Sequence, residues 1–128
     1  MTADVTATAR VSATMAVPDA PATAVALDVD GTLVDSVDAH ARAWVAALAQ
    51  FGVKVGFEDV RPLIGMGGDK LLPRVSGISA DSDVGKAISK RRSEIFRETE
   101  LDRLRPMPGA HDLVDALRDR GLTFGVAT

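Results

Sequence analysis

The chain has 128 residues, of which 46% are hydrophobic and 26% charged, so it can build a core and is not disordered throughout. Its net charge of −3 gives no global positive field for nucleic acid or an anionic membrane, and no apolar run approaches the roughly 18 residues of a membrane span. The absence of cysteine excludes disulfides, thiolate metal sites and a cysteine nucleophile, and we expect a cytoplasmic protein.

The beginning of the chain predicts a tail followed by a strand. Residues 1–22 are rich in alanine and threonine and show no helical or strand periodicity, so we expect them to be flexible. From Ala24 the chain is apolar on both faces up to Asp28 and Asp30. This pattern is typical of a strand that is buried on both sides in a parallel sheet.

The middle of the chain predicts several helices. Ser36 is a favourable N-cap, and the apolar stripe that follows it indicates a helix that Gly52 ends. Two shorter segments each contain a proline and flank the glycine-rich loop 65–68. The expected helices cover residues 37–51, 58–64, 69–75 and 84–99, and in the last of them Val84, Ile88, Ile95 and Phe96 are expected to face inward.

The end of the chain predicts a last helix and a second strand. Residues 106–109, Pro-Met-Pro-Gly, mark a boundary, and the apolar spacing after them indicates a helix over residues 110–120. Gly121 ends this helix, and residues 122–128 form an apolar strand. Two such strands separated by helices indicate an α/β fold with a parallel pair and an insertion between its strands.

Asp28 and Asp30 are the first candidates for chemistry. They are two residues apart in the expected strand, so their side chains point to the same side at its carboxyl end, where open α/β sheets place their sites. Both carboxylates stay ionised only with a cation nearby, and Mg²⁺ prefers such oxygen ligands. Alternatively, one carboxyl is protonated and acts as an acid, or the pair belongs to an ordinary turn.

The nine residues 28–36, DVDGTLVDS, resemble the first signature of the haloacid-dehalogenase superfamily at each characteristic position. The resemblance extends over residues 24–128 and implies a Rossmann-like α/β core of parallel strands, partial in this chain, with an inserted α-helical cap. It assigns residues 23–36 and 106–128 to the core and residues 37–105 to the cap. The cap is similar to that of the subgroup with β-phosphoglucomutase and phosphoglycolate phosphatase.

The resemblance also implies a mechanism. Asp28 would be the nucleophile that forms an aspartyl-phosphate, and Asp30 would be the general acid/base. Mg²⁺ would bind the Asp28 carboxylate and the main-chain carbonyl of Asp30, and Gly31 and Thr32 would contact the phosphoryl group. Dehalogenases of this fold lack an aspartate at the second position, so Asp30 favours phosphoester chemistry.

The superfamily's second signature is a serine or threonine that closes an apolar strand and binds the phosphoryl group. Residues 125–128, Gly-Val-Ala-Thr, have this form, so the resemblance gives that role to Thr128. The third and fourth signatures are a phosphate-binding lysine and an acidic pair that completes the Mg²⁺ shell. They would lie beyond Thr128, and we therefore expect the 128-residue chain by itself to show little activity.

His40 is a candidate in the cap. Residues 40–44, His-Ala-Arg-Ala-Trp, resemble the start of the mutase's first cap helix, in which the histidine helps to position the acid/base aspartate. His40 would then touch Asp30 or the substrate. The alternative is a solvated histidine near a helix N-terminus.

Gly67, Gly68 and Lys70 belong to a glycine-rich segment that has the spacing of neither a dinucleotide fingerprint nor a P-loop. In capped relatives a cap loop selects the substrate, so these three residues are candidates for binding a phosphate or a sugar. The alternative is a flexible connector with a surface lysine.

These features together predict a Mg²⁺-dependent phosphatase that acts on a small phosphorylated metabolite, without nucleic acid or membrane as a partner. One alternative is a sugar phosphomutase of the same fold, which residues 40–44 favour and Thr32 weakly disfavours. Another is a non-catalytic fragment that at most binds a metal or a protein. Phosphoglycolate, a sugar phosphate and a nucleotide are all compatible with the sequence, which also leaves the oligomeric state open.

Overall fold

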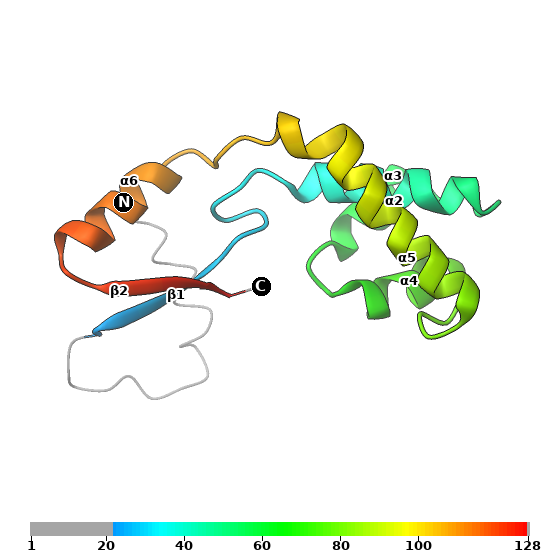
Figure 1. Cartoon of the computed structure of the whole chain (residues 1–128), viewed down its shortest axis with the longest axis horizontal. Helices are drawn as coiled ribbons and strands as arrows, with labels where there is room; N and C mark the ends of the chain where they lie inside the picture. Colours follow the sequence, from blue (N-terminus) through cyan, green and yellow to red (C-terminus); the bar gives the residue numbers. More distant parts are fainter. Residues whose placement is uncertain (1–21, 128) are drawn as a thin grey trace. The chain divides into compact units, whose positions relative to one another are not determined.

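A computed structural model describes residues 22–127 of the chain. Thr128 and all but the last residue of the predicted tail therefore lie outside the described residues. The chain divides into two compact units (Figure 1). Unit 1 contains, of the described residues, 22–35 and 105–127, and unit 2 is Ser36–Leu104. Among the described residues, no helix has the length and apolar character that crossing a membrane requires.

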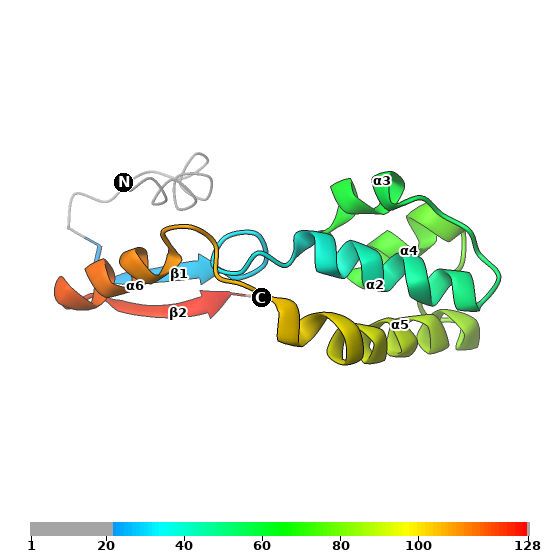
Figure 2. The same cartoon turned by 90° about the horizontal axis from the view of Figure 1, so that it is seen from above.

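Unit 1 is built on two parallel strands, β1 (Ala24–Asp28) and β2 (Thr123–Ala127). Asp28 pairs with Ala127, so both strands end at the same edge of the sheet. Helix α6 (Ala110–Asp119) precedes β2 and lies along the sheet (Figure 2). The α/β class and the parallel pairing of the two apolar strands are thus confirmed.

The prediction that the first strand is buried on both faces is wrong for the described residues. Leu27 is the buried residue of β1, and Val126 of β2 is 63% exposed. Within residues 22–127 each strand has one hydrogen-bonded neighbour, and α6 is the helix that packs against the sheet. An apolar strand is covered on both faces only when it has elements on both sides, and the described part of unit 1 supplies fewer than that.

Unit 2 is helical. Its two longest helices, α2 and α5, pack against each other, and the shorter elements flank them (Figures 1 and 2). A π-helical segment, η2, continues α5, and a short 3₁₀ helix, η3, follows it. The elements are α2 (Val37–Gln50), α3 (Phe57–Val60), η1 (Arg61–Leu63), α4 (Gly68–Ser76), α5 (Asp83–Ile95), η2 (Phe96–Glu100) and η3 (Leu101–Arg103).

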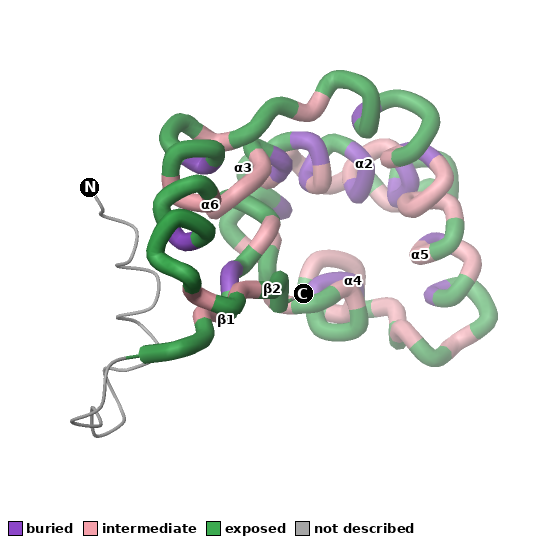
Figure 3. Tube along the Cα trace, turned by 60° about the vertical axis from the view of Figure 1, so that its left-hand side comes forward, coloured by how far each residue is buried: buried purple, intermediate pink, exposed green. Residues whose placement is uncertain are grey.

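The core of unit 2 is formed within the unit itself. Trp44 and Leu48 of α2 belong to it, and buried positions recur along this helix (Figure 3). Small alanine side chains on α2 allow its neighbours to approach closely. The core consists of Ala41, Ala43, Trp44, Ala47, Leu48, Val60, Leu71, Leu72, Ile88 and Ile95. The Trp44 side chain is also covered by Arg92, whose Cζ lies 5.1 Å from the ring centroid.

The start of α5 differs from the prediction. Val84, expected to face inward, is 50% exposed, whereas Gly85 is buried. A Cβ atom built on Gly85 would lie 2.0 Å from the carbonyl oxygen of Ser79. The glycine face of this turn therefore meets the preceding chain, and Val84, about 100° away around the helix, faces solvent.

Two serines, Ser82 and Ser36, stand at the N-caps of α5 and α2, and only one of them caps its helix with the side chain. Ser82 caps α5, since its hydroxyl accepts a hydrogen bond from the Gly85 backbone N–H at 3.0 Å. Ser36 precedes α2 as predicted, but its side chain makes no capping hydrogen bond and it is 1% exposed. Ser36 therefore stands at the N-cap position of α2 as predicted, but the prediction that its side chain caps the helix is wrong.

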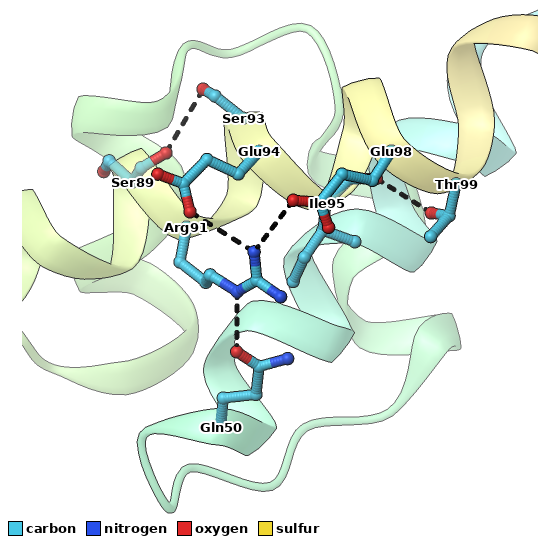
Figure 4. A network of polar contacts seen from close by, with 8 residues as sticks. All are labelled: Gln50, Ser89, Arg91, Ser93, Glu94, Ile95, Glu98 and Thr99. Carbon is cyan, nitrogen blue, oxygen red and sulfur yellow. Dashed lines mark hydrogen bonds and ion pairs between the residues drawn. The ribbon is translucent and has the colours of Figure 1, made fainter.

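The end of α2 is joined to the α5–η2 segment by a polar network (Figure 4). The Arg91 Nε donates to Gln50 Oε1 at 2.8 Å. The Arg91 Nη1 lies 3.2 Å from the nearer carboxylate oxygen of Glu94 and 3.4 Å from that of Glu98. These groups are partly exposed, so each ion pair contributes at most about 1 kcal/mol.

Candidate functional site

The loop that follows β1 folds around one carbonyl group. The carbonyl oxygen of Val29 accepts hydrogen bonds from the backbone N–H groups of Thr32, Leu33 and Val34 at 3.2, 2.9 and 3.0 Å. The Gly31 N–H donates to the Val34 carbonyl at 2.8 Å. Gly31 has a φ of 78°, which glycine adopts without steric penalty. The signature motif therefore forms a tight turn that needs glycine at its tip.

The end of this loop is fixed by a second segment of unit 1. The Asp35 N–H donates to the Arg105 carbonyl at 2.8 Å, and the Met107 N–H donates to the Leu33 carbonyl at 2.8 Å. Residues 33–35 therefore run antiparallel to residues 105–107. Backbone hydrogen bonds therefore hold the loop at both its start and its end.

Asp28 and Asp30 lie at the edge where the strands end. Asp28 is the last residue of β1 and is exposed, and its Oδ1 accepts a hydrogen bond from the Val29 N–H at 3.0 Å. Asp30 is also exposed, and Val29 between them is half-buried. The structure thus brings Asp28, Asp30, Gly31 and Thr32 together at the carboxyl edge of the sheet, where α/β folds bind ligands. Thr128, which follows the strand partner of Asp28, lies outside the described residues.

The donors at this edge suit a hard cation. Carboxylate and main-chain carbonyl oxygens, as Asp28 and Asp30 offer, are ligands that Mg²⁺ prefers. Among residues 22–127, no cluster of three or more acidic, histidine or cysteine side chains is placed to hold a metal. The two aspartates therefore fit the chemistry of Mg²⁺, and by themselves they offer fewer donors than a complete coordination shell.

His40 is the fourth residue of α2 and is half-buried. Its ring stacks on Phe96 of η2 with centroids 4.3 Å apart and ring planes 9° from parallel. One face of the His40 ring is therefore covered by Phe96, while part of the side chain remains accessible to solvent. His40 belongs to unit 2 and Asp30 to unit 1, so a contact between them stays a prediction.

The glycine-rich segment has structural reasons for its glycines. Gly67 has a φ of 85°, a value that favours glycine. Gly68 is the first residue of α4 and packs on Trp44, whose Cζ2 would lie 2.9 Å from a Cβ at this position. Lys70 is exposed in the first turn of α4, and its backbone N–H donates to the Gly67 carbonyl at 3.1 Å. Of these three candidates, Lys70 is the one with a side chain that a ligand could use.

Sequence reasoning missed an ion pair that joins α2 to η2. The Arg42 Nε donates to both carboxylate oxygens of Glu100 at 3.1 and 3.2 Å, and Nη2 donates to Oε1 at 2.5 Å. This hydrogen bonding raises the pKa of the Arg42 guanidinium above its ordinary value, although desolvation opposes it. Glu100 is only 5% exposed. Glu100 lies one residue beyond the expected helix 84–99, and its position four residues after the inward-facing Phe96 was the one available signal.

Comparison with known proteins identifies the family. The model of the haloacid dehalogenase-like hydrolase family matches residues 22–128. The chain belongs to this family, as the resemblance of its first signature predicted.

Individual relatives agree with this assignment. The chain is 31% identical over 108 residues to the phosphoglycolate phosphatase of Caulobacter vibrioides, covering 81% of this chain and 46% of that protein. It is 33% identical over 117 residues to the phosphonoacetaldehyde hydrolase of Bordetella pertussis, covering 80% and 42% respectively. The crystal structure of a hydrolase from Pseudomonas syringae superimposes with a TM-score of 0.75 at 25% identity, covering 84% of this chain and 49% of that one. The chain therefore spans somewhat less than half the length of these relatives.

Proposed function

We propose that the protein is a Mg²⁺-dependent phosphatase that hydrolyses a small phosphorylated metabolite in the cytoplasm through an aspartyl-phosphate. The observation that carries the proposal is the exposed Asp28 at the end of β1, followed by a hydrogen-bonded turn that presents Asp30 two residues later. The family assignment and the similarity to a phosphoglycolate phosphatase support it.

In the first step an oxygen of the Asp28 carboxylate attacks phosphorus, and the bond from phosphorus to the leaving oxygen breaks. Asp30 donates a proton to that oxygen, so the product leaves as an alcohol. The Val29 N–H, which donates to Asp28 Oδ1, holds the carboxylate in place and leaves its other oxygen for the attack.

In the second step Asp30, now ionised, takes a proton from water, and the resulting oxygen attacks phosphorus. The bond to Asp28 breaks, inorganic phosphate is released, and the free Asp28 carboxylate is restored. Bound Mg²⁺ would offset the repulsion between the Asp28 carboxylate and the phosphate. Gly31 and Thr32 lie in the same turn and are the described residues that we assign to phosphate contact.

Unit 2 is the cap in this proposal, and it recognises the leaving group of the substrate. The core residues bind the phosphoryl group, which all substrates share. Residues of unit 2 therefore distinguish one substrate from another, and His40 and the exposed Lys70 are the candidates. Lys70 is a cation that can meet an anionic group of a metabolite.

A sugar phosphomutase is the second candidate, because His40 at the start of α2 is where the resembled mutase carries its positioning histidine. In a mutase the aspartyl-phosphate returns its phosphoryl group to a sugar, and activity needs a bisphosphorylated sugar. A phosphatase needs no such activator. Adding the activator in the assay below therefore separates the two.

The test uses the 128-residue chain and an extended chain, in which the C-terminal half of the Caulobacter phosphatase follows residue 128. We expect the extended chain to hydrolyse p-nitrophenyl phosphate and phosphoglycolate only with Mg²⁺. Asp28→Asn should abolish turnover, and Asp30→Asn should reduce it by about 10² to 10⁴. Asp119→Asn, at an exposed aspartate that ends α6, is the matched control and should have normal activity.

Three results would contradict the proposal. They are turnover without a divalent metal, normal turnover by Asp28→Asn, and no turnover by an extended chain that circular dichroism and gel filtration show to be folded and soluble.

A further inference from the structure

One residue, Val34, holds the peptide groups on both sides of Asp30. The Val34 N–H donates to the carbonyl oxygen of Val29 at 3.0 Å, and the Gly31 N–H donates to the Val34 carbonyl at 2.8 Å. Asp30 and Val34 thereby form a short parallel bridge. The backbone of Asp30 can therefore move only if Val34 moves with it or if these two hydrogen bonds break.

Val34 is held in turn by residues 105–107, which we call the strap. The peptide groups on both sides of Val34 are hydrogen-bonded to the strap at 2.8 Å, one to the Arg105 carbonyl and the other to the Met107 N–H. Between these two bonds, Val34 forms an antiparallel bridge with Pro106. The strap is thus connected to the signature turn through two successive pairs of backbone hydrogen bonds, and all four bonds lie within unit 1.

Prolines follow both residues of the strap that make these hydrogen bonds, since residues 105–108 read Arg-Pro-Met-Pro. A residue before proline disfavours the helical conformation and favours the extended one, which a β bridge requires. Pro106 has no N–H to donate, and its position requires none, because its two neighbours make the hydrogen bonds of the bridge. The two prolines therefore restrict the strap to the kind of backbone conformation in which it binds Val34.

The strap is also joined directly to the sheet of unit 1. The Ala110 N–H donates to the Met107 carbonyl at 3.0 Å and closes a turn whose central residues are Pro108 and Gly109. Gly109 has a φ of 83° and a ψ of −4°, the values of the third residue of a type II turn, in which proline is favoured at the second position. Helix α6 begins at Ala110 and packs against β2. The end of the strap is therefore fixed to the same sheet that carries Asp28.

We propose that Pro106 and Pro108 are positioning residues, which keep the strap extended and so hold the backbone of Asp30 where its carboxyl group can transfer protons. The proposal rests on the proposed phosphatase function and adds two residues that lie outside the signature motifs. Both prolines act through Val34 and need no contact with the substrate. Without them the strap is detached from the turn for a larger fraction of the time, and proton transfer by Asp30 is slower.

The first test measures hydrogen exchange of backbone amides by NMR in the complete 128-residue chain. The amides of Asp35 and Met107 donate across the bridge, and we expect both to exchange at least about tenfold more slowly than in an unfolded chain. Pro106→Gly should accelerate both by about tenfold, because glycine widens the range of conformations open to the detached strap. Pro62→Gly, at an exposed proline of unit 2, is the matched control and should leave both rates unchanged. Unprotected amides in the wild-type chain, or rates that Pro106→Gly does not alter, would overturn the proposal.

The second test is kinetic and uses the extended chain. Met107→Pro removes the N–H that donates to the Leu33 carbonyl, whereas Met107→Ala shortens the side chain and keeps this N–H. We expect kcat of Met107→Pro to be about tenfold or more below that of Met107→Ala, with KM within about twofold, since small misplacements of a reacting group have large effects.

A second variant deletes no hydrogen bond and keeps the proposal testable if Met107→Pro fails to fold. Pro106→Gly combined with Pro108→Gly should lower kcat about threefold or more. Pro106→Val combined with Pro108→Val should restore it, because β-branched residues favour the extended conformation. An unchanged kcat in the double glycine variant, or in a folded Met107→Pro protein, would overturn the proposal while the phosphatase function stands.

A double-mutant cycle distinguishes positioning of Asp30 from general support of the fold. If the strap acts through Asp30, Met107→Pro should have no further effect on kcat in an Asp30→Asn background. A further loss in that background would overturn the proposal. Failure of the phosphatase function itself shows separately, as absent Mg²⁺-dependent turnover in the parent extended chain.

Discussion

Removal of Arg42 is the perturbation that tests the energetics of unit 2 most sharply. Glu100 is 5% exposed and accepts every hydrogen bond of the pair, whereas the Arg42 side chain is 49% exposed. Arg42→Met therefore leaves a carboxylate buried without its partner. Glu100→Met leaves a guanidinium that water can still reach. The two substitutions break the same contact, but their effects on stability should be unequal.

The magnitude follows from this difference in exposure. Truncating one side of a buried ion pair destabilises a protein by about 3 to 5 kcal/mol, and we expect Arg42→Met to lie near the low end, at about 3 kcal/mol. Losing the pair while the remaining charge stays hydrated costs about 1 kcal/mol, which we expect for Glu100→Met. In the double variant no charge is left buried, so it should be more stable than Arg42→Met alone.

Urea unfolding followed by far-ultraviolet circular dichroism measures these differences. Most helical residues belong to unit 2, so the helical signal reports chiefly on this unit. Arg61, which pairs with Asp38 at an exposed position, supplies the matched control: Arg61→Met should cost less than about 1 kcal/mol. The reasoning is refuted if Arg42→Met is no more destabilising than Glu100→Met, or if the double variant is the least stable of the three.

Two further predictions concern the packing of unit 2 and the role in substrate binding that we propose for it. Gly85→Ala should destabilise unit 2 by about 2 kcal/mol in the same assay, because the new Cβ would meet the Ser79 carbonyl at 2.0 Å. Gly56→Ala meets only the carboxylate groups of the Asp59 and Glu58 side chains and should cost much less, and equal losses would argue against the clash. Lys70→Ala should raise KM severalfold with kcat nearly unchanged, whereas Lys54→Ala at another exposed lysine should alter neither. Unchanged KM for several phosphorylated substrates would show that Lys70 is an ordinary surface residue.

Features set by neighbouring residues could be predicted from the sequence. The long helices α2 and α6 and both strands lie within a few residues of their predicted bounds, because periodicity, glycine stops and capping residues are local signals. The shorter proline-containing helices were also found, with Pro62 as the second residue of η1 and Pro73 inside α4. The motif that begins at Asp28 indicated the family, since its type of turn and its carboxylates depend on consecutive residues.

Features that depend on distant residues could not be predicted in this way. Val84 was expected inside because its spacing fits the apolar stripe, but the carbonyl of Ser79 occupies the space next to α5. Arg42 and Glu100 are 58 residues apart, and no local pattern pairs them. The stack of Phe96 on His40 likewise depends on how η2 packs on α2, which a helical pattern alone does not specify.

The most direct test of the central claim is chemical trapping of the phosphorylated residue. The Asp30→Asn form of the extended chain is mixed with p-nitrophenyl phosphate and Mg²⁺, since this leaving group needs little protonation. Hydrolysis is slowed because residue 30 can no longer take a proton from water, so the intermediate accumulates. After an acid quench, borohydride reduces an aspartyl-phosphate to homoserine, which mass spectrometry locates. The account predicts homoserine at position 28 and none in Asp28→Asn. Homoserine at another aspartate, or none from a parent protein that turns over, would contradict it.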